Sequence, residues 1–265
     1  MLNRLVESFR KRGARLTDTM RMTRGQEPVP EATTAPEQKS KPAKRPSMPL
    51  ARKPLAFVDT ETTGLDTLEN EIIELAFILE SQGGSDGWWP SDRWVWKLEA
   101  LAMLGEPHSH FVHNEGSLLE FATRIKPQRI ETAHPIALEV NGYTEEGWKH
   151  MPRFDATFAE VLVGVLRNVV FIAHNVSFDH EFISRSCHRA SISPKFGYHK
   201  IDTVTLAFEH LRGATDSLSL DHICPILGVT NENAHTALAD VQRCREVYYK
   251  LLGATEEQRR TWGAQ

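Results

Sequence analysis

Cysteine is scarce in this sequence, and its positions exclude the common cysteine-based frameworks. The 265 residues include only three cysteines, Cys187, Cys224 and Cys244, which are far apart and form no Cys-x-x-Cys pair. Neither a disulfide scaffold nor a cysteine-rich zinc site is therefore expected. Long apolar runs are also missing, because no stretch approaches the roughly 20 residues that a membrane-spanning helix needs. Both absences predict a soluble protein in a reducing compartment, and we expect it in the cytoplasm.

Acidic side chains are scarce at the start of the chain, although the whole chain has a net charge of −4. Residues 1–53 contain 13 of the 31 lysines and arginines but only 5 of the 35 acidic residues. Residues 18–54 are rich in proline and nearly free of large apolar side chains, so they cannot bury enough surface to offset the entropy of ordering. We predict a disordered basic tail over 1–53, a folded domain over 54–253 and a short C-terminal tail over 254–265.

The tail begins with apolar residues at helical spacing among arginines and lysines, namely Leu2, Leu5, Val6 and Phe9. A basic amphipathic helix of this kind forms on a partner, which here would be nucleic acid, an anionic surface, or a polymerase or other protein. A frayed tail and an organellar targeting segment are the alternatives.

Two carboxylates follow the first apolar strand, predicted over residues 55–60. Side chains alternate between the faces of a strand, so Asp59 and Glu61 project from the same side. Two carboxylates this close repel each other, and a hard divalent cation between them would offset the repulsion. The pair is therefore a candidate metal site, although an exposed strand end would carry the same residues.

The remaining pattern is that of an α/β fold. Residues 71–79 predict a second buried strand antiparallel to the first, and residues 120–126 predict a third strand. Residues 154–166 have the periodicity of an amphipathic helix, and the apolar run 169–173 predicts a buried strand directly after it. Further helices are expected from 178, from 203 to 211, from 218 to 227 and after 235.

Residues 81–117 predict an excursion from this domain, with a hairpin within 93–98. Four tryptophans lie there within nine positions, and packing against the domain and stacking on unpaired bases are both consistent with them. His108, His110 and His113 have a spacing that could hold zinc, but we favour a solvated loop because no ligand partner is obvious nearby.

A third and a fourth carboxylate occur where later elements begin. Asp179 falls in the first turn of the helix that follows the strand 169–173, at the sheet edge where open α/β folds place their sites. Asp202 precedes another helix, and we assign it to capping, with a role near the metal site as the alternative. His235 and Asp240 are about 140° apart on an ideal helix, so both face one site only if His235 lies on the preceding loop.

The combination of three motifs in this order resembles the DEDDh exonucleases. This DnaQ-like family includes the proofreading exonuclease subunit of bacterial DNA polymerase III. The resemblance covers about residues 54–252. It depends on Asp59-Thr60-Glu61-Thr62-Thr63-Gly64-Leu65, Ala173-His174-Asn175 with Phe178-Asp179, and Ala234-His235-Thr236-Ala237-Leu238-Ala239-Asp240.

The resemblance implies a ribonuclease H-like fold, with a mixed five-stranded sheet flanked by helices. It also implies that two Mg²⁺ or Mn²⁺ ions are held by the carboxylates Asp59, Glu61, Asp179 and Asp240. His235 would be the general base that takes a proton from the attacking water. Two ions about 4 Å apart would stabilise both the attacking and the leaving oxygen.

The same resemblance implies contacts to the terminal nucleotide. Thr62 and Gly64 would approach its sugar and 3′-hydroxyl, Leu65 would wedge against its base, and His174 and Phe178 would line the other wall. The expected reaction is release of nucleoside 5′-monophosphates from DNA 3′ ends, in proofreading or repair. Trimming of RNA 3′ ends uses the same residues, and a non-catalytic nucleic-acid-binding scaffold is the alternative from another class.

Overall fold

A computed structural model describes residues 49–82, 92–106, 109–114, 118–230 and 235–253. The chain divides into two units between residues 45 and 46, and all described residues belong to the second. The predicted tails and part of the excursion, including His108 and two of its tryptophans, lie outside the described residues. Within the described part, no helix is long and apolar enough to cross a membrane.

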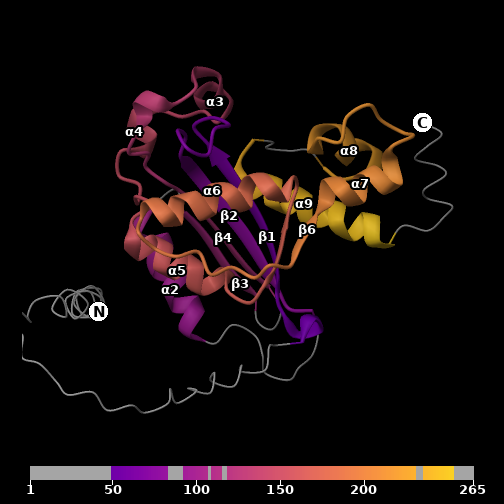
Figure 1. Cartoon of the computed structure of the whole chain (residues 1–265), viewed down its shortest axis with the longest axis horizontal. Helices are drawn as coiled ribbons and strands as arrows, with labels where there is room; N and C mark the ends of the chain where they lie inside the picture. The colour runs from indigo at the N-terminus through magenta and orange to yellow at the C-terminus, as the bar shows by residue number, and fades with distance from the viewer. Residues whose placement is uncertain (1–48, 83–91, 107–108, 115–117, 231–234, 254–265) are drawn as a thin grey trace, which may run out of the picture. The chain divides into compact units, whose positions relative to one another are not determined.

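A six-stranded mixed sheet forms the centre of this unit (Figure 1). The spatial order is β3-β4-β2-β1-β5-β6, so the first strand of the chain lies near the middle. Strands β5 and β6 run parallel to β1, whereas β2 is antiparallel to it as predicted. The strands are β1 (Leu55–Thr62), β2 (Ile72–Glu80), β3 (Ser109–Asn114), β4 (Leu118–Arg124), β5 (Val170–Ala173) and β6 (Lys200–Asp202).

Helices cover both faces of the sheet. Helices α2, α5 and α6 pack on one face, and α9 packs on the other, flanked by α7 and α8 (Figure 1). The long helices are α2 (Asp92–Leu104), α5 (Ala156–Leu166), α6 (Val176–Arg189), α7 (Thr203–Leu211), α8 (Leu220–Leu227) and α9 (Ala237–Gly253). The short ones are η1 (Leu50–Arg52), η2 (Ile130–Thr132), α3 (Pro135–Val140) and α4 (Glu145–Trp148).

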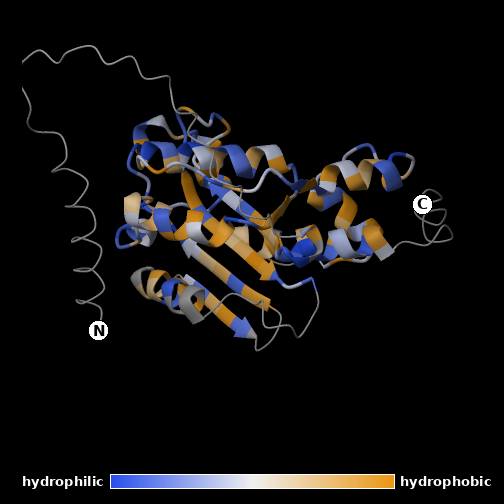
Figure 2. Ribbon diagram, turned by 60° about the horizontal axis from the view of Figure 1, so that its bottom comes forward, coloured by the Kyte–Doolittle hydropathy of each residue, from blue (hydrophilic) through white to orange (hydrophobic). Residues whose placement is uncertain are grey.

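Alternate residues of β1 belong to different apolar cores. Ala56 and Val58 pack with the helices α2, α5 and α6, whereas Leu55 and Phe57 pack with α9. Figure 2 shows apolar residues concentrated along the central strands and the helix faces that meet them. Because β1 is buried on both faces, its position is strongly constrained. The two carboxylates that follow Phe57 on the α9 face are thus held on a rigid strand.

The ribonuclease H-like architecture is confirmed, but the sheet has six strands where five were predicted. The additional pairing comes from the predicted excursion, since β3 pairs antiparallel with β4 along its whole length. His110 and His113 therefore lie on an edge strand and not in a solvated loop, and His110 pairs with Glu120 of β4.

The predicted hairpin at 93–98 is wrong, because these residues belong to helix α2. Leu98, Leu101 and Ala102 recur at helical spacing and are buried in the core that α2 shares with α5 and β4. Burial of this apolar stripe favours a helix over the predicted hairpin.

Candidate active site

Strand β1 carries two of the candidate residues to the α9 face of the sheet. Asp59 and Glu61 follow Phe57 at alternate positions, so they share its face as predicted. The β2 partner of Asp59 is Ala76, whose small side chain leaves room beside the carboxylate. A register irregularity lies between Glu61 and Thr62, at the end of β1.

Helix α9 supplies the third carboxylate. Asp240 lies in its first turn, and carboxylate oxygens of Asp59, Glu61 and Asp240 all lie within 4.8 Å of one another. Residues about 180 positions apart in the sequence are therefore joined in one site. Oxygen ligands grouped in this way suit a hard divalent cation such as Mg²⁺ or Mn²⁺.

Asp179 approaches the site from the opposite face of the sheet. It is 2% exposed and lies in the first turn of α6, as expected. Its Oδ1 accepts hydrogen bonds from the backbone N–H and the hydroxyl of Thr60, both at 2.9 Å. Pairing of β1 with β5 ends at Phe57, so Asp179 satisfies an N–H of β1 that β5 no longer reaches. This contact fixes the helix start against the strand that carries Asp59 and Glu61.

The raised pKa values of the carboxylates indicate that the negative charge of the site is not balanced. Burial, and then the charges of Asp179, Asp240 and Glu61, raise the pKa of Asp59 well above its usual range. Burial and the neighbouring carboxylates also raise the pKa of Glu61 to about 7, and burial raises that of Asp179 to about 7. Carboxylates buried together at this cost are characteristic of functional sites. The donor set and its unbalanced charge both fit divalent cations.

Arg243, which the sequence motifs did not indicate, is a cation that hydrogen-bonds directly to this cluster. Its side chain is only 5% exposed, one helical turn beyond Asp240. It donates from Nε and Nη2 to Oδ1 of Asp240 and from Nη1 to Oδ1 of Asp221 at 3.0 Å. Arg243 thereby holds Oδ1 of Asp240 in place, and this also fixes the orientation of the second carboxylate oxygen.

His235 lies on the loop directly before α9, as predicted, and has positive φ (68°). Its imidazole is 53% exposed, and Nε2 is 3.9 Å from Oδ2 of Asp221 on α8. Asp221 therefore links His235 to Arg243 and through it to Asp240. His235 thus presents an exposed imidazole on a loop, whereas Asp240 is anchored in the first turn of a helix.

Glu74 is a further acidic side chain at this site that the motifs did not indicate. It is the cross-strand partner of Glu61 on β2, and its pKa is raised by burial. It accepts a hydrogen bond from Nε of Arg124 at 3.1 Å and one from the N–H of Ala237 at 3.4 Å. Glu74 thus connects the sheet to the start of α9. The alternation of side chains along β2 could have indicated which face of the sheet Glu74 occupies. Its partners Arg124 and Ala237, however, become adjacent to it only in the folded chain.

The loop after Glu61 is closely packed at its base and exposed at its tip. The hydroxyl of Thr62 donates to the carbonyl of Gly64 at 2.6 Å, and Thr62 is buried. A Cβ on Gly64 would come within 2.5 Å of the side chain of Asn70, so only glycine fits. Leu65 is 84% exposed at the tip. The side chain of Leu65 is therefore accessible to a ligand.

The two residues predicted to line the opposite wall have different surroundings. Nε2 of His174 donates to the carbonyl of Leu218 at 2.7 Å, and Nδ1 is 2.9 Å from the hydroxyl of Thr203. Both ring nitrogens thus tie β5 to the start of α7 and the loop before α8. Phe178 is half-buried beside Asp179 and packs on Phe182 with ring centroids 4.7 Å apart. Of these two residues, only Phe178 has part of its side chain exposed and not engaged by hydrogen bonds.

Asp202, predicted to be a capping residue, caps two helices. Its Oδ1 accepts from the N–H of Val204 at 3.1 Å as the N-cap of α7. The same oxygen accepts from the N–H groups of Asn175 and Val176 at the start of α6. Asp202 therefore fixes the turn after β5 that Asn175, in the left-handed conformation, initiates.

Comparison with known proteins identifies a family match over more than half of the chain. The exonuclease family RNase_T matches residues 110–248, which include Asp179, His235 and Asp240. Ribonuclease T of Shewanella sp. (strain W3-18-1) is 26% identical over 207 residues, which are 74% of this chain and 79% of that protein. DNA polymerase III PolC-type of Thermotoga petrophila is 27% identical over 195 residues, but the match spans only 12% of its length.

Solved structures of exonuclease I have the same fold. The complex of the E. coli enzyme with a dA16 oligonucleotide superimposes with a TM-score of 0.55 and 18% identity, over 80% of this chain. The match covers 43% of that chain, so this protein spans less than half the length of exonuclease I.

Proposed function

The chain belongs to the exonuclease family, as its motifs predicted, and from this premise we propose that it is a divalent-metal-dependent 3′-to-5′ exonuclease. The observation that carries the proposal is the grouping of Asp59, Glu61 and Asp240 within 4.8 Å, with Asp179 beside them. The reaction is hydrolysis of the terminal phosphodiester bond of a single strand. The products are nucleoside 5′-monophosphates, released one at a time.

The four carboxylates would hold two Mg²⁺ or Mn²⁺ ions. Bound there, the ions would supply charge stabilisation for the attacking and leaving oxygens of the displacement. Arg243 keeps Asp240 oriented, and Thr60 keeps Asp179 oriented. His235 accepts the proton from the attacking water, and Asp221 stabilises the resulting imidazolium.

The loop after Glu61 would seat the terminal nucleotide. Leu65 packs against the terminal base, and the backbone near Thr62 and Gly64 contacts the sugar and the 3′-hydroxyl. Phe178 supplies the opposite wall. His174 acts behind it as support, because its ring nitrogens are engaged by Thr203 and Leu218.

DNA 3′ ends are the first candidate substrate, in proofreading or repair, since exonuclease I with its DNA oligonucleotide has the same fold. RNA 3′ ends are the second candidate. The observation in its favour is that ribonuclease T matches over most of its own length, whereas exonuclease I matches over less than half. For the basic residues 1–53 we retain the proposal that they attach to nucleic acid or to a polymerase or other protein, on the grounds of their charge.

Degradation of 5′-labelled DNA and RNA oligonucleotides of one sequence tests the proposal. We expect a ladder that shortens from the 3′ end with Mg²⁺ or Mn²⁺ and disappears with EDTA. The ratio of the DNA and RNA rates then selects the substrate. Cleavage of neither strand by the folded protein with metal present would refute the proposal in favour of a binding scaffold.

A further inference from the structure

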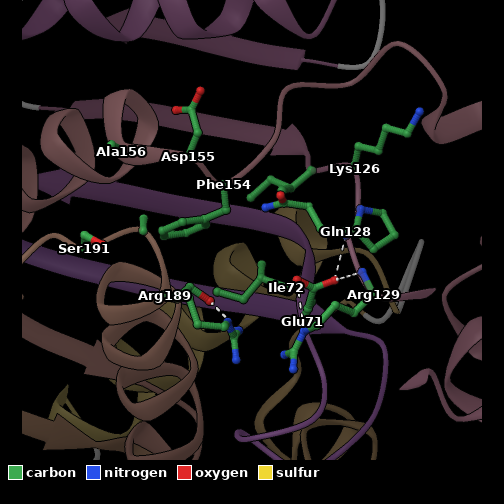
Figure 3. Close-up of a pocket in the computed structure, with 14 residues that line it drawn as sticks. Glu71, Ile72, Lys126, Gln128, Arg129, Phe154, Asp155, Ala156, Arg189 and Ser191 are labelled. Carbon is green, nitrogen blue, oxygen red and sulfur yellow. Dashed lines mark hydrogen bonds and ion pairs between the residues drawn. The ribbon is translucent and has the colours of Figure 1, made fainter. Parts of the chain in front are cut away.

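A cavity of about 430 Å³ lies on the other face of the sheet from Asp59 and Glu61 (Figure 3). Its walls come from the start of β2, the segment 125–129 after β4, the start of α5 and the end of α6. Ligand sites of proteins have volumes of roughly 300–1,000 Å³. A bare inorganic anion would leave most of this space unfilled, whereas a nucleotide is of the right size.

Two arginines face one carboxylate in this cavity. The guanidinium groups of Arg129 and Arg189 lie side by side next to Glu71 (Figure 3). Glu71 already accepts hydrogen bonds from the backbone N–H groups of Gln128 and Arg129, both at 2.7 Å, and its Oε1 is 3.7 Å from Nε of Arg129. That Nε is buried and has no hydrogen-bond partner. Burial and the charge of Arg129 lower the pKa of Arg189, as expected for positive charge in excess.

The other charged groups that line the cavity do not balance the excess positive charge of Arg129 and Arg189. Asp155 caps helix α5 by accepting from the N–H of Phe158 at 2.9 Å, and its carboxylate points away from the arginines (Figure 3). The ammonium of Lys126 also points away and donates to the carbonyl of Lys149 at 3.0 Å. The cavity therefore favours an anion at Arg129 and Arg189.

The rest of the lining is apolar. The half-buried ring of Phe154 faces the cavity opposite the arginines (Figure 3), and Ile72, Ile125 and Pro127 also line the cavity. An aromatic face is a stacking surface for any base. We propose that this cavity binds a nucleotide unit, with its phosphate at Arg129 and Arg189 and its base against Phe154. The source is either a free nucleoside 5′-monophosphate or an internal nucleotide of a single strand.

The arginines also connect the cavity to the loop after Glu61. Both terminal nitrogens of Arg129 donate to the carbonyl of Leu68 at 3.3 Å, and Nη1 of Arg189 donates to that of Thr67 at 3.1 Å. This loop follows Thr62, the last residue of β1, and ends at Glu71, directly before β2. A nucleotide in the cavity therefore restrains the loop that carries Leu65.

Isothermal titration of the full chain in EDTA tests this site without turnover. The probes are thymidine 5′-monophosphate, thymidine and a dT10 strand. We expect Arg189→Gln and Phe154→Leu to weaken binding of a phosphate-bearing probe by about 10-fold or more, as for loss of a charge-assisted hydrogen bond or a stacking contact. Arg185→Gln is the matched control, since Arg185 lies on the same helix and pairs with Glu181 outside the cavity.

The outcomes separate the two sources. Variant-sensitive binding of the monophosphate identifies a free nucleotide, and binding of dT10 alone identifies a strand. Arg129→Gln replaces Arg189→Gln if thermal melting shows the latter to be unfolded. Equal affinity for thymidine and its monophosphate, no binding of any probe, or affinities unchanged in the cavity variants would overturn the proposal. Because EDTA abolishes metal-dependent cleavage, this result is independent of whether the protein is an exonuclease.

Discussion

Replacement of Glu61 by glutamine should stabilise the metal-free protein at alkaline pH, although it removes a proposed metal ligand. Glutamine keeps the shape of the side chain and removes its charge from a cluster that also contains Asp59 and Asp240. In the wild-type protein, the proposed cations would offset this repulsion. Function and stability oppose each other at such a position.

The size of the effect follows from the pKa of Glu61. Burial and the neighbouring charges raise it from 4.5 to about 7, which corresponds to about 3 kcal/mol at roughly 1.4 kcal/mol per pKa unit. The folded state holds this proton more tightly than the unfolded chain. Stability present below about pH 4.5 is therefore lost as the pH rises toward 7. Glu61→Gln should exceed the melting temperature of the wild type only slightly at pH 5, where less than about 1 kcal/mol has been lost, and by about 6–12 °C at pH 8.

Calorimetric melting in EDTA at pH 5 and pH 8 measures this difference. Saturating Mg²⁺ should reverse the order at pH 8, because the wild type gains binding free energy that the variant loses. Glu160→Gln is the matched control, since Glu160 is exposed on α5. A Glu61→Gln variant that melts at or below the wild-type temperature in EDTA at pH 8 would refute the reasoning.

Three further predictions concern the base, the loop and the core. His235→Ala should lower the cleavage rate by about 10²–10⁴-fold and leave Mn²⁺-induced thermal stabilisation intact; loss of that stabilisation would make His235 a ligand. Leu65→Ala should raise KM, but because Leu65 is 84% exposed it should change the unfolding free energy by less than about 0.5 kcal/mol; unchanged KM would contradict its contact with the base. Phe121→Ala removes a buried ring stacked on Phe77 at 5.0 Å and should cost about 3–5 kcal/mol in urea unfolding, with a loss below 1 kcal/mol as the contrary result.

The proposed ligands could be placed from the sequence because each belongs to a regular element. Strand periodicity put Asp59 and Glu61 on one face, and the helix pattern of α9 put His235 on the loop before it. Capping chemistry likewise identified Asp202 at the start of a helix. Local periodicity and capping depend on neighbours in sequence, so they can be read without the fold.

The residues that support the site could not be placed in this way. The bonds of Arg243 to Asp221 and of Glu74 to Arg124 join elements that become adjacent only in the folded chain. Helix α2 was missed for a related reason. Its apolar stripe is short, and the helix is favoured by burial of residues such as Leu98 against elements that are distant in the sequence.

Mn²⁺ titration combined with cleavage of a 5′-labelled strand tests the central claim most directly. Asp240→Asn removes a carboxylate that lies far in sequence from Asp59 but within 4.8 Å of it in the folded chain. We predict that the wild type and Glu160→Gln bind Mn²⁺ and degrade the strand from its 3′ end, and that Asp240→Asn, still folded, loses both. Undiminished Mn²⁺ binding and cleavage by Asp240→Asn would contradict the account.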